Sequence, residues 1–279
     1  MRRPASGQRP NDTFHQAALG RRLAGALPRP SPQGRADVAE WLSGIRRTVA
    51  GKAIASLLQD YARLASLLGG IAETSPYLWD LVRADAARFL RLISGDADAA
   101  LTALLVTARE AAAAAKTTAE LMRVLRRAKA EAALLVALAD IGGVWPVARV
   151  TAALTEVAEM ALGAAVGHLL GGAKARGKLA FADPQNPAAG SGYIVLAMGK
   201  MGGHELNFSS DIDLMVFFDP AVASLAPNVE ASPFYVRMTR ELVKLLQERT
   251  ADGYVFRVDL RLRPDPSSTW SRWTTRPVR

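Results

Sequence analysis

Two aspartates stand one residue apart at the start of an apolar run, and their type and spacing suit metal chemistry. In 211-DIDLMVFFD-219, Asp211 and Asp213 precede a stretch of Leu, Met, Val and Phe. On an extended strand, residues i and i+2 point to the same side, so these carboxylates would lie close together. Like charges resist ionisation unless a cation compensates them. Mg²⁺ prefers such hard oxygens, so the pair predicts a magnesium site; the alternative is an ordinary surface or turn pair.

A third carboxylate, Asp259, lies in the segment 256-FRVDLRLRP-264, which alternates in the manner of a strand. If this strand neighbours the first, three carboxylates converge and can hold two metals for displacement at phosphorus. Arg257, Arg261 and Arg263 alternate with Asp259 and suit bidentate binding of polyphosphate. The alternative is an ion-pair ladder that only neutralises Asp259.

The loop before the aspartate pair predicts a phosphate-binding element. Gly202 and Gly203 follow the apolar run 193-YIVLAMG-199, and their backbone amides could approach a phosphate. Ser209 and Ser210 can donate hydroxyl hydrogen bonds to the same group, and Lys200 can add positive charge. Neither a P-loop nor a G-x-G-x-x-G pattern is present, so an ordinary turn is the alternative.

Other catalytic chemistries lack their residues. The chain has no cysteine and only three histidines, which are scattered at His15, His168 and His204. Thiolate zinc sites, cysteine nucleophiles and Ser-His-Asp catalysis are therefore disfavoured. The absence of cysteine also fits a reducing cytosol, and we expect a cytoplasmic protein.

Hydrophobic periodicity divides the chain into a helical part and a part with strands. Apolar residues recur at helical spacing over 54–74, and Ser75-Pro76 predicts the start of a helix over 77–93. Asp96 is expected to cap a helix over 97–115. A further helix to Asp140 carries a basic stripe, which we interpret as its solvated side. The stripe comprises Arg123, Arg126, Arg127 and Lys129.

After these helices the pattern becomes strand, loop, strand, helix and strand, so the sequence predicts an α+β protein with an N-terminal helical bundle. The predicted domains are a flexible basic leader over 1–37, a helical domain over 38–174, a linker over 175–192, a catalytic core over 193–269 and an atypical tail over 270–279.

The net charge of +9 comes from the two ends of the chain. Lys and Arg outnumber Asp and Glu by 9 to 3 in residues 1–50 and by 6 to 2 in 257–279, which leaves 20 against 21 over 51–256. A nucleic-acid surface needs many cations on one folded face, so none is expected. The sequence contains no uninterrupted apolar run of about 18 residues, so no membrane span is predicted.

The strings GKMGGHELNFSSDIDL and RVDLRLRP closely resemble the signatures of the glutamine synthetase adenylyltransferase/adenylyl-removing enzyme family, within the polymerase β-type nucleotidyltransferase superfamily. The resemblance covers roughly residues 55 to 268. Because 75-SPYLWDLVRADAARFL-90 resembles the opening of these proteins, it implies the N-terminal, adenylyl-removing half.

The resemblance implies a polymerase β-type domain with a small mixed sheet that removes AMP from a tyrosine of glutamine synthetase by phosphorolysis, releasing ADP. It implies that Asp211, Asp213 and Asp259 hold Mg²⁺, while Gly202, Gly203 and Ser210 line the phosphate site. A P-II-type signal protein is the implied regulatory partner.

Two alternatives remain open at this level: adenylyl transfer from ATP to glutamine synthetase, and a non-catalytic fragment that binds nucleotide or glutamine synthetase. The ending 270-WSRWTTRPVR-279 does not resemble the family's continuation, in which a second catalytic domain follows. We therefore expect a truncated or frame-shifted reading after Ser268.

Overall fold

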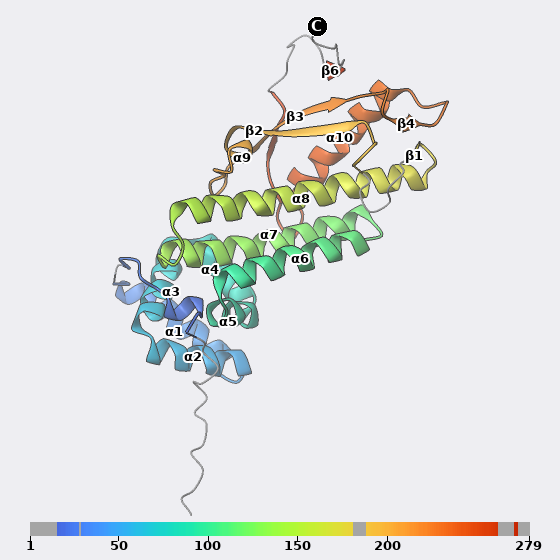
Figure 1. Cartoon of the computed structure of the whole chain (residues 1–279). Coiled ribbons are helices and arrows are strands. Elements are labelled where there is room, and N and C mark those ends of the chain that lie inside the picture. Colours follow the sequence, from blue (N-terminus) through green and yellow to red (C-terminus); the bar gives the residue numbers. More distant parts are fainter. Residues whose placement is uncertain (1–15, 28, 181–187, 262–270, 273–279) are drawn as a thin grey trace, which may run out of the picture. The chain divides into compact units, whose positions relative to one another are not determined.

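The computed structural model describes residues 16–27, 29–180, 188–261 and 271–272. They belong to two compact units: residues up to 104 with 130–150, and residues 105–129 with 151 onward. Three long helices contribute residues to both units: α6 (Ala97–Ala114), α7 (Thr118–Ile141) and α8 (Val147–Ala175). The expected α+β class is confirmed, with helices first and small sheets later in the chain (Figure 1).

The first unit contains a short 3-10 helix and five short α-helices, coloured blue to cyan in Figure 1. They are η2 (Leu19–Arg21), α1 (Pro32–Ile45), α2 (Val49–Asp60), α3 (Ala62–Thr74), α4 (Pro76–Ala84) and α5 (Ala86–Ser94). The prediction of a single helix over 77–93 is wrong, because two helices, α4 and α5, occupy this span. Asp85 has extended backbone and caps α5, since its carboxylate accepts from Arg88 N at 2.9 Å.

Capping and aromatic packing define this unit. The Ser75 hydroxyl accepts from Leu78 N at the start of α4, and the Asp96 carboxylate accepts from Ala99 N at 3.0 Å, as expected for both caps. Trp41 packs edge-to-face against Trp79 at 5.5 Å between ring centroids. Within the predicted leader, Leu19 is fully buried and its amide donates to Gly95 O at 2.8 Å.

The second unit contains a small mixed sheet. β2 (Tyr193–Met198) pairs antiparallel with β3 (Ile212–Phe218), which pairs parallel with β5 (Val258–Asp259) and with β6 (Ser271–Arg272). A separate two-stranded sheet joins β1 (Leu179–Ala180) to β4 (Ser224–Leu225). Of the long strand suggested by 254–262, the described residues form only β5, and residue 262 lies outside them.

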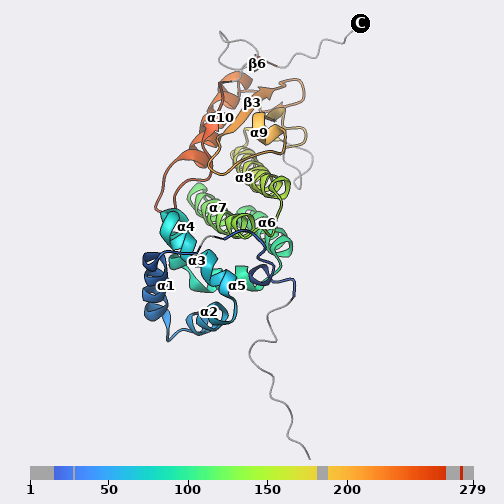
Figure 2. The ribbon, with the colours of Figure 1, turned by 90° about the vertical axis from the view of Figure 1, so that its left-hand side faces the viewer.

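The helix α10 (Ala231–Gln247) runs alongside β2 and β3, as Figures 1 and 2 both show. Its buried side packs through aromatic rings: Tyr235 stacks on Phe218 with centroids 5.1 Å apart and on Tyr193 at 5.8 Å. The Tyr193 hydroxyl and the Thr239 hydroxyl are 2.8 Å apart. These contacts attach α10 to the sheet and thereby fix where the chain leaves the helix toward β5.

Among the described helices, α8 alone is long and apolar enough to cross a membrane, and 56% of its most apolar window is buried inside the protein. Burial of this kind is typical of a core helix. Its Thr155 is fully buried, and the hydroxyl accepts from Leu206 N at 3.3 Å. The helix therefore anchors the loop that precedes β3.

The basic stripe on α7 was interpreted as a solvated side, and for one of its residues this interpretation is wrong. Arg126 is 1% exposed, so it does not belong to a solvated side. Its guanidinium donates to carbonyl oxygens of Met122, Leu245, Glu248 and Gly253. Two of these carbonyls, those of Leu245 and Glu248, lie at the C-terminal end of α10. A buried cation there satisfies carbonyls that the helix leaves unpaired and opposes the negative end of its dipole.

Candidate functional site

Strand pairing brings two of the three predicted carboxylates side by side. In the parallel ladder between β3 and β5, Asp213 is the register partner of Asp259, and Ile212 is the partner of Val258. Ile212 is fully buried and its amide donates to Arg257 O at 2.9 Å, which fixes this register. The two strands, whose adjacency the sequence left as a condition, are therefore neighbours.

The third carboxylate lies immediately before β3 and is held by an arginine. Arg257 donates through Nε to Asp211 Oδ1 at 2.5 Å and through Nη2 to Ser209 O at 2.9 Å. Hydrogen bonding to Asp211, together with its charge, raises the pKa of Arg257. Both side chains are about half exposed, so solvent screens this pair strongly.

Arg261 forms a bidentate pair with Asp259. Its Nε lies 2.8 Å from Asp259 Oδ2, and its backbone amide lies 2.8 Å from Oδ1. These hydrogen bonds hold the pKa of Asp259 below its usual range. The pKa of Arg261 is raised, first by the hydrogen bond and charge of Asp259, and further by the charges of Asp213 and Asp211. One exposed guanidinium therefore experiences all three carboxylates.

This arrangement tests whether the acids fit a divalent metal. Within the described part of the chain, no three acidic or histidine side chains converge closely enough to hold a metal ion. The donors are nevertheless hard carboxylates from adjacent positions, and a cationic group, the Arg261 guanidinium, already lies beside them. The arginine side chain is 89% exposed, which leaves it room to turn away. The residue types therefore suit Mg²⁺, but in this structure Arg257 and Arg261 occupy two of the three carboxylates.

A glycine that sequence reasoning did not single out sets the position of Asp213. Gly199 begins α9 (Gly199–Gly202) with φ +54°, a conformation that favours glycine. A Cβ at this position would lie 2.5 Å from Asp213 Oδ2. The position of Gly199 directly after a predicted strand could have identified it as a residue of the site. Gly199 therefore allows the Asp213 carboxylate to lie against the chain turn.

The predicted glycine pair divides into two different cases. A Cβ on Gly202 would lie 2.5 Å from Ala197 O, so close backbone approach requires glycine there. Gly203 has φ −85°, and a Cβ would meet nothing closer than 3.6 Å. Its amide donates to Gly199 O at 3.0 Å. Only the first glycine is thus demanded by the fold of this turn.

The remaining loop residues lie around this turn. Lys200 is exposed on α9, Ser210 is half-buried, and Ser209 is exposed with φ +57°. His204, also at φ +57°, lies 3.7 Å from Glu159 on α8. Arg263 lies outside the described residues.

Comparison with known proteins assigns the chain to a family. The family model described as glutamate-ammonia ligase adenylyltransferase matches residues 65–275, which is most of the chain. The chain belongs to this family. The match begins within α3 and includes every later helix and the described residues of the candidate site.

Similar relatives in this adenylyltransferase family come from several bacteria, and each is named bifunctional glutamine synthetase adenylyltransferase/adenylyl-removing enzyme. The Bradyrhizobium diazoefficiens relative is 58% identical over 82% of this chain and 23% of its own length. The Bradyrhizobium sp. BTAi1 relative is 52% identical over 93% of this chain and 26% of its own length. The Xanthobacter autotrophicus relative is 58% identical over 72% of this chain and 20% of its own length. The chain thus spans about a quarter of the curated relatives it matches.

Proposed function

We propose that this chain is a nucleotidyltransferase that removes AMP from an adenylylated tyrosine of glutamine synthetase by Mg²⁺-dependent phosphorolysis. The observation that carries the proposal is the register pairing of Asp213 with Asp259, with Asp211 just before the same strand. Family membership and the names of the relatives support glutamine synthetase as the protein substrate. The choice of removal rests on the resemblance of residues 75–90 to the opening of these proteins.

In the proposed reaction, an oxygen of inorganic phosphate attacks the phosphorus of the tyrosine-bound AMP. A new phosphorus–oxygen bond forms, the bond from phosphorus to the tyrosine oxygen breaks, and the proton of HPO₄²⁻ ends on that oxygen. The products are ADP and tyrosine. Mg²⁺ held by Asp211, Asp213 and Asp259 would neutralise charge on the attacking and leaving oxygens.

The exposed arginines have a role of their own in this proposal. Arg257 and Arg261 each present a planar guanidinium that now binds a carboxylate, and the same geometry binds phosphate oxygens. When the carboxylates bind metal, both arginines become available for the phosphate and for the AMP phosphoryl group. Lys200, Ser209 and Ser210 add donors from the neighbouring loop, and Gly202 keeps that turn compact.

The proposal is tested with labelled substrates. The purified 279-residue chain is incubated with Mg²⁺, ³²P-phosphate and adenylylated glutamine synthetase, and labelled ADP is measured. We expect ADP in proportion to the tyrosine regained. If no ADP forms, while a full-length relative releases it under the same conditions, the proposal is wrong.

Adenylyl transfer is the second candidate, because the relatives carry both activities in their name. Incorporation of α-³²P-ATP label into unmodified glutamine synthetase, without a requirement for phosphate, would favour it. Binding of glutamine synthetase with no turnover in either assay would instead favour a non-catalytic fragment. A cytoplasmic location and response to a P-II-type signal protein belong to the same proposal.

A further inference from the structure

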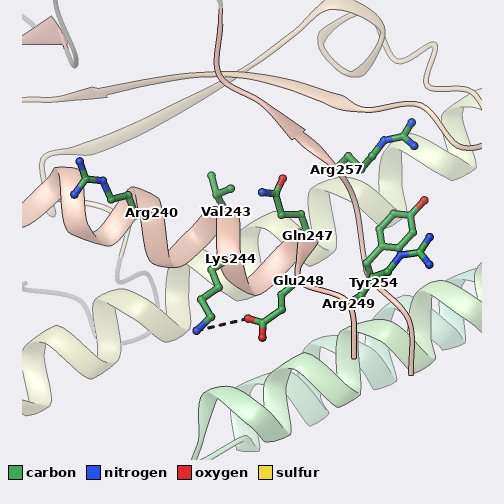
Figure 3. Close-up of a pocket in the computed structure, with 8 residues that line it drawn as sticks. All are labelled: Arg240, Val243, Lys244, Gln247, Glu248, Arg249, Tyr254 and Arg257. Carbon is green, nitrogen blue, oxygen red and sulfur yellow. Dashed lines mark ion pairs between the residues drawn. The ribbon is translucent and has the colours of Figure 1, made fainter. Parts of the chain in front are cut away.

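A groove of about 610 Å³ lies along the exposed side of α10, next to the candidate site but lined by different residues. Figure 3 shows it with its lining side chains, which come from the last two turns of α10 and from the segment that leads into β5. The lining residues are Arg240, Val243, Lys244, Gln247, Glu248, Arg249, Tyr254 and Arg257. Four are cationic and one is acidic.

The groove is built by helical spacing. Arg240, Lys244 and Gln247 recur at three- and four-residue intervals, so they lie on one face of α10 and extend along it. At 1.5 Å per residue, the stretch from Arg240 to Gln247 is about 10 Å long. Figure 3 shows Arg240 at one end and Arg257 at the other. The positive charges are therefore spread along a line instead of meeting at one point.

Two of these four cations form exposed ion pairs, Lys244 with Glu248 and Arg257 with Asp211. Glu248 lies 3.6 Å from Lys244 in an exposed pair, which is weak in solvent. Arg240 forms no ion pair with any residue that the structure describes. Arg249 lies over the ring of Tyr254, with its Cζ 5.5 Å from the centroid. The groove thus offers a row of accessible cations beside one aromatic surface.

The groove leads to the acidic cluster through Arg257. This residue lines the groove and also donates to Asp211 at 2.5 Å. The floor is tied to β5 because Gln247 Oε1 accepts from Val258 N, one residue before Asp259. A molecule lying in the groove would therefore end beside the carboxylates.

We infer that this groove binds an acidic segment of the protein substrate, adjacent to the residue from which AMP is removed. An extended peptide advances about 3.3 Å per residue, so three or four residues cover the α10 part of the groove. Carboxylates spaced along such a peptide match cations spaced along the helix. The near-neutral charge of residues 51–256 disfavours nucleic acid, which would need a larger basic surface. This inference rests on the proposed function for the identity of the substrate only.

Direct binding tests the groove without requiring turnover. A fluorescein-labelled decaglutamate peptide is titrated with the chain, and anisotropy gives its Kd at several salt concentrations. We expect saturable binding that weakens with salt, and about tenfold weaker binding by the variant Arg240→Gln/Lys244→Gln. The matched control is Arg46→Gln/Arg47→Gln, which removes the same charge from exposed positions of the first unit and should bind as the wild type does.

A second readout links the groove to the substrate. With adenylylated glutamine synthetase, the groove variant should raise KM for the protein about tenfold, while KM for phosphate and kcat stay unchanged. Equal peptide affinity in all three proteins, or equal loss in both variants, overturns the inference. So does a ten-nucleotide RNA that binds more tightly than the peptide and depends on the same two residues. If neither the wild type nor the variants release AMP from glutamine synthetase, the proposed function fails. The peptide titration still tests whether the groove binds an acidic segment.

Discussion

Arg126 and Arg261 lie in the same compact unit, but they occupy opposite kinds of surroundings. Arg126 is 1% exposed and donates to backbone carbonyls, two of which, those of Leu245 and Glu248, lie at the end of α10. The Arg261 side chain is 89% exposed and donates to the carboxylate of Asp259. A buried cation is tolerated only when its donors are satisfied, so Arg126 is fixed in place. An exposed ion pair contributes little stability and can exchange partners.

The unit thus contains one fixed, buried arginine at the end of α10 and exposed, exchangeable arginine pairs at the candidate site. The brace at Arg126 fixes the turn from α10 toward β5, and β5 carries Asp259 beside Asp213. The exposed arginines occupy carboxylates that the proposed function assigns to metal. Substitutions at the candidate site should therefore change activity, while substitution of Arg126 should change stability.

The largest effect is expected from Asp213→Asn. The side chain is half-buried and lies beside Asp259, so removing its charge weakens metal binding without emptying the core. The rate of ADP release should fall about 10³-fold, while the free energy of unfolding changes by about 0.5 kcal/mol or less. Rate assays and urea unfolding measure both. A variant that keeps wild-type activity would place the chemistry elsewhere.

Arg126→Met should act on stability. Loss of the guanidinium removes the donor of the Leu245 and Glu248 carbonyls at the end of α10, and we expect the free energy of unfolding to fall by about 3 kcal/mol. The neighbouring Arg127 is a matched control, because its side chain is 71% exposed and only 3.5 Å from Asp252. Arg127→Met should change stability by about 0.5 kcal/mol at most. Equal losses in the two variants would remove the distinction between brace and surface.

Gly199→Ala should affect both properties moderately. The positive φ costs a non-glycine residue about 1 kcal/mol, and the new methyl group would displace the Asp213 carboxylate. We expect about a tenfold loss of rate together with this loss of stability. Gly203→Ala is the control, since its φ is negative and its surroundings are open. If the two variants behave alike, the position of Asp213 does not depend on the turn.

The smallest effect is a loss of stability at high pH. Burial raises the pKa of Tyr235 to about 12 and also raises that of Tyr193. Above pH 10 the unfolded tyrosine loses its proton while the folded one keeps it, so stability falls between about pH 10 and 12. At pH 11 we expect a loss of about 1 kcal/mol from Tyr235. Urea unfolding of Tyr235→Phe should show a shallower decline; an unchanged decline would exclude this tyrosine as the cause.

Much of the scaffold could be predicted from local patterns. Ser75 and Asp96 cap helices as expected, and apolar runs became β2 and β3. The break at Asp85 was missed because periodicity continues across it, although an aspartate is a good N-cap. The sequence predicted that Asp259 lies near Asp213 only if their two strands are neighbours. It could not show that they are, since strand pairing joins residues far apart in sequence.

Other features needed three dimensions. Nothing in the sequence around Arg126 separates it from Arg127, yet one is buried and the other exposed, because α10 lies against only one side of this turn of α7. The row of cations along α10 was equally hidden, since Arg249 and Arg257 join it from outside the helix. Helical periodicity identifies a face but not what packs on it.

The most direct test of the central claim is a Mn²⁺ titration followed by electron paramagnetic resonance, since carboxylate sites accept Mn²⁺ as well as Mg²⁺. The account predicts saturable binding by the wild-type chain, binding at least about tenfold weaker in Asp259→Asn, and binding as tight or tighter in Arg261→Met, which removes the competing cation. Equal binding by all three proteins would contradict the assignment of these carboxylates to a metal.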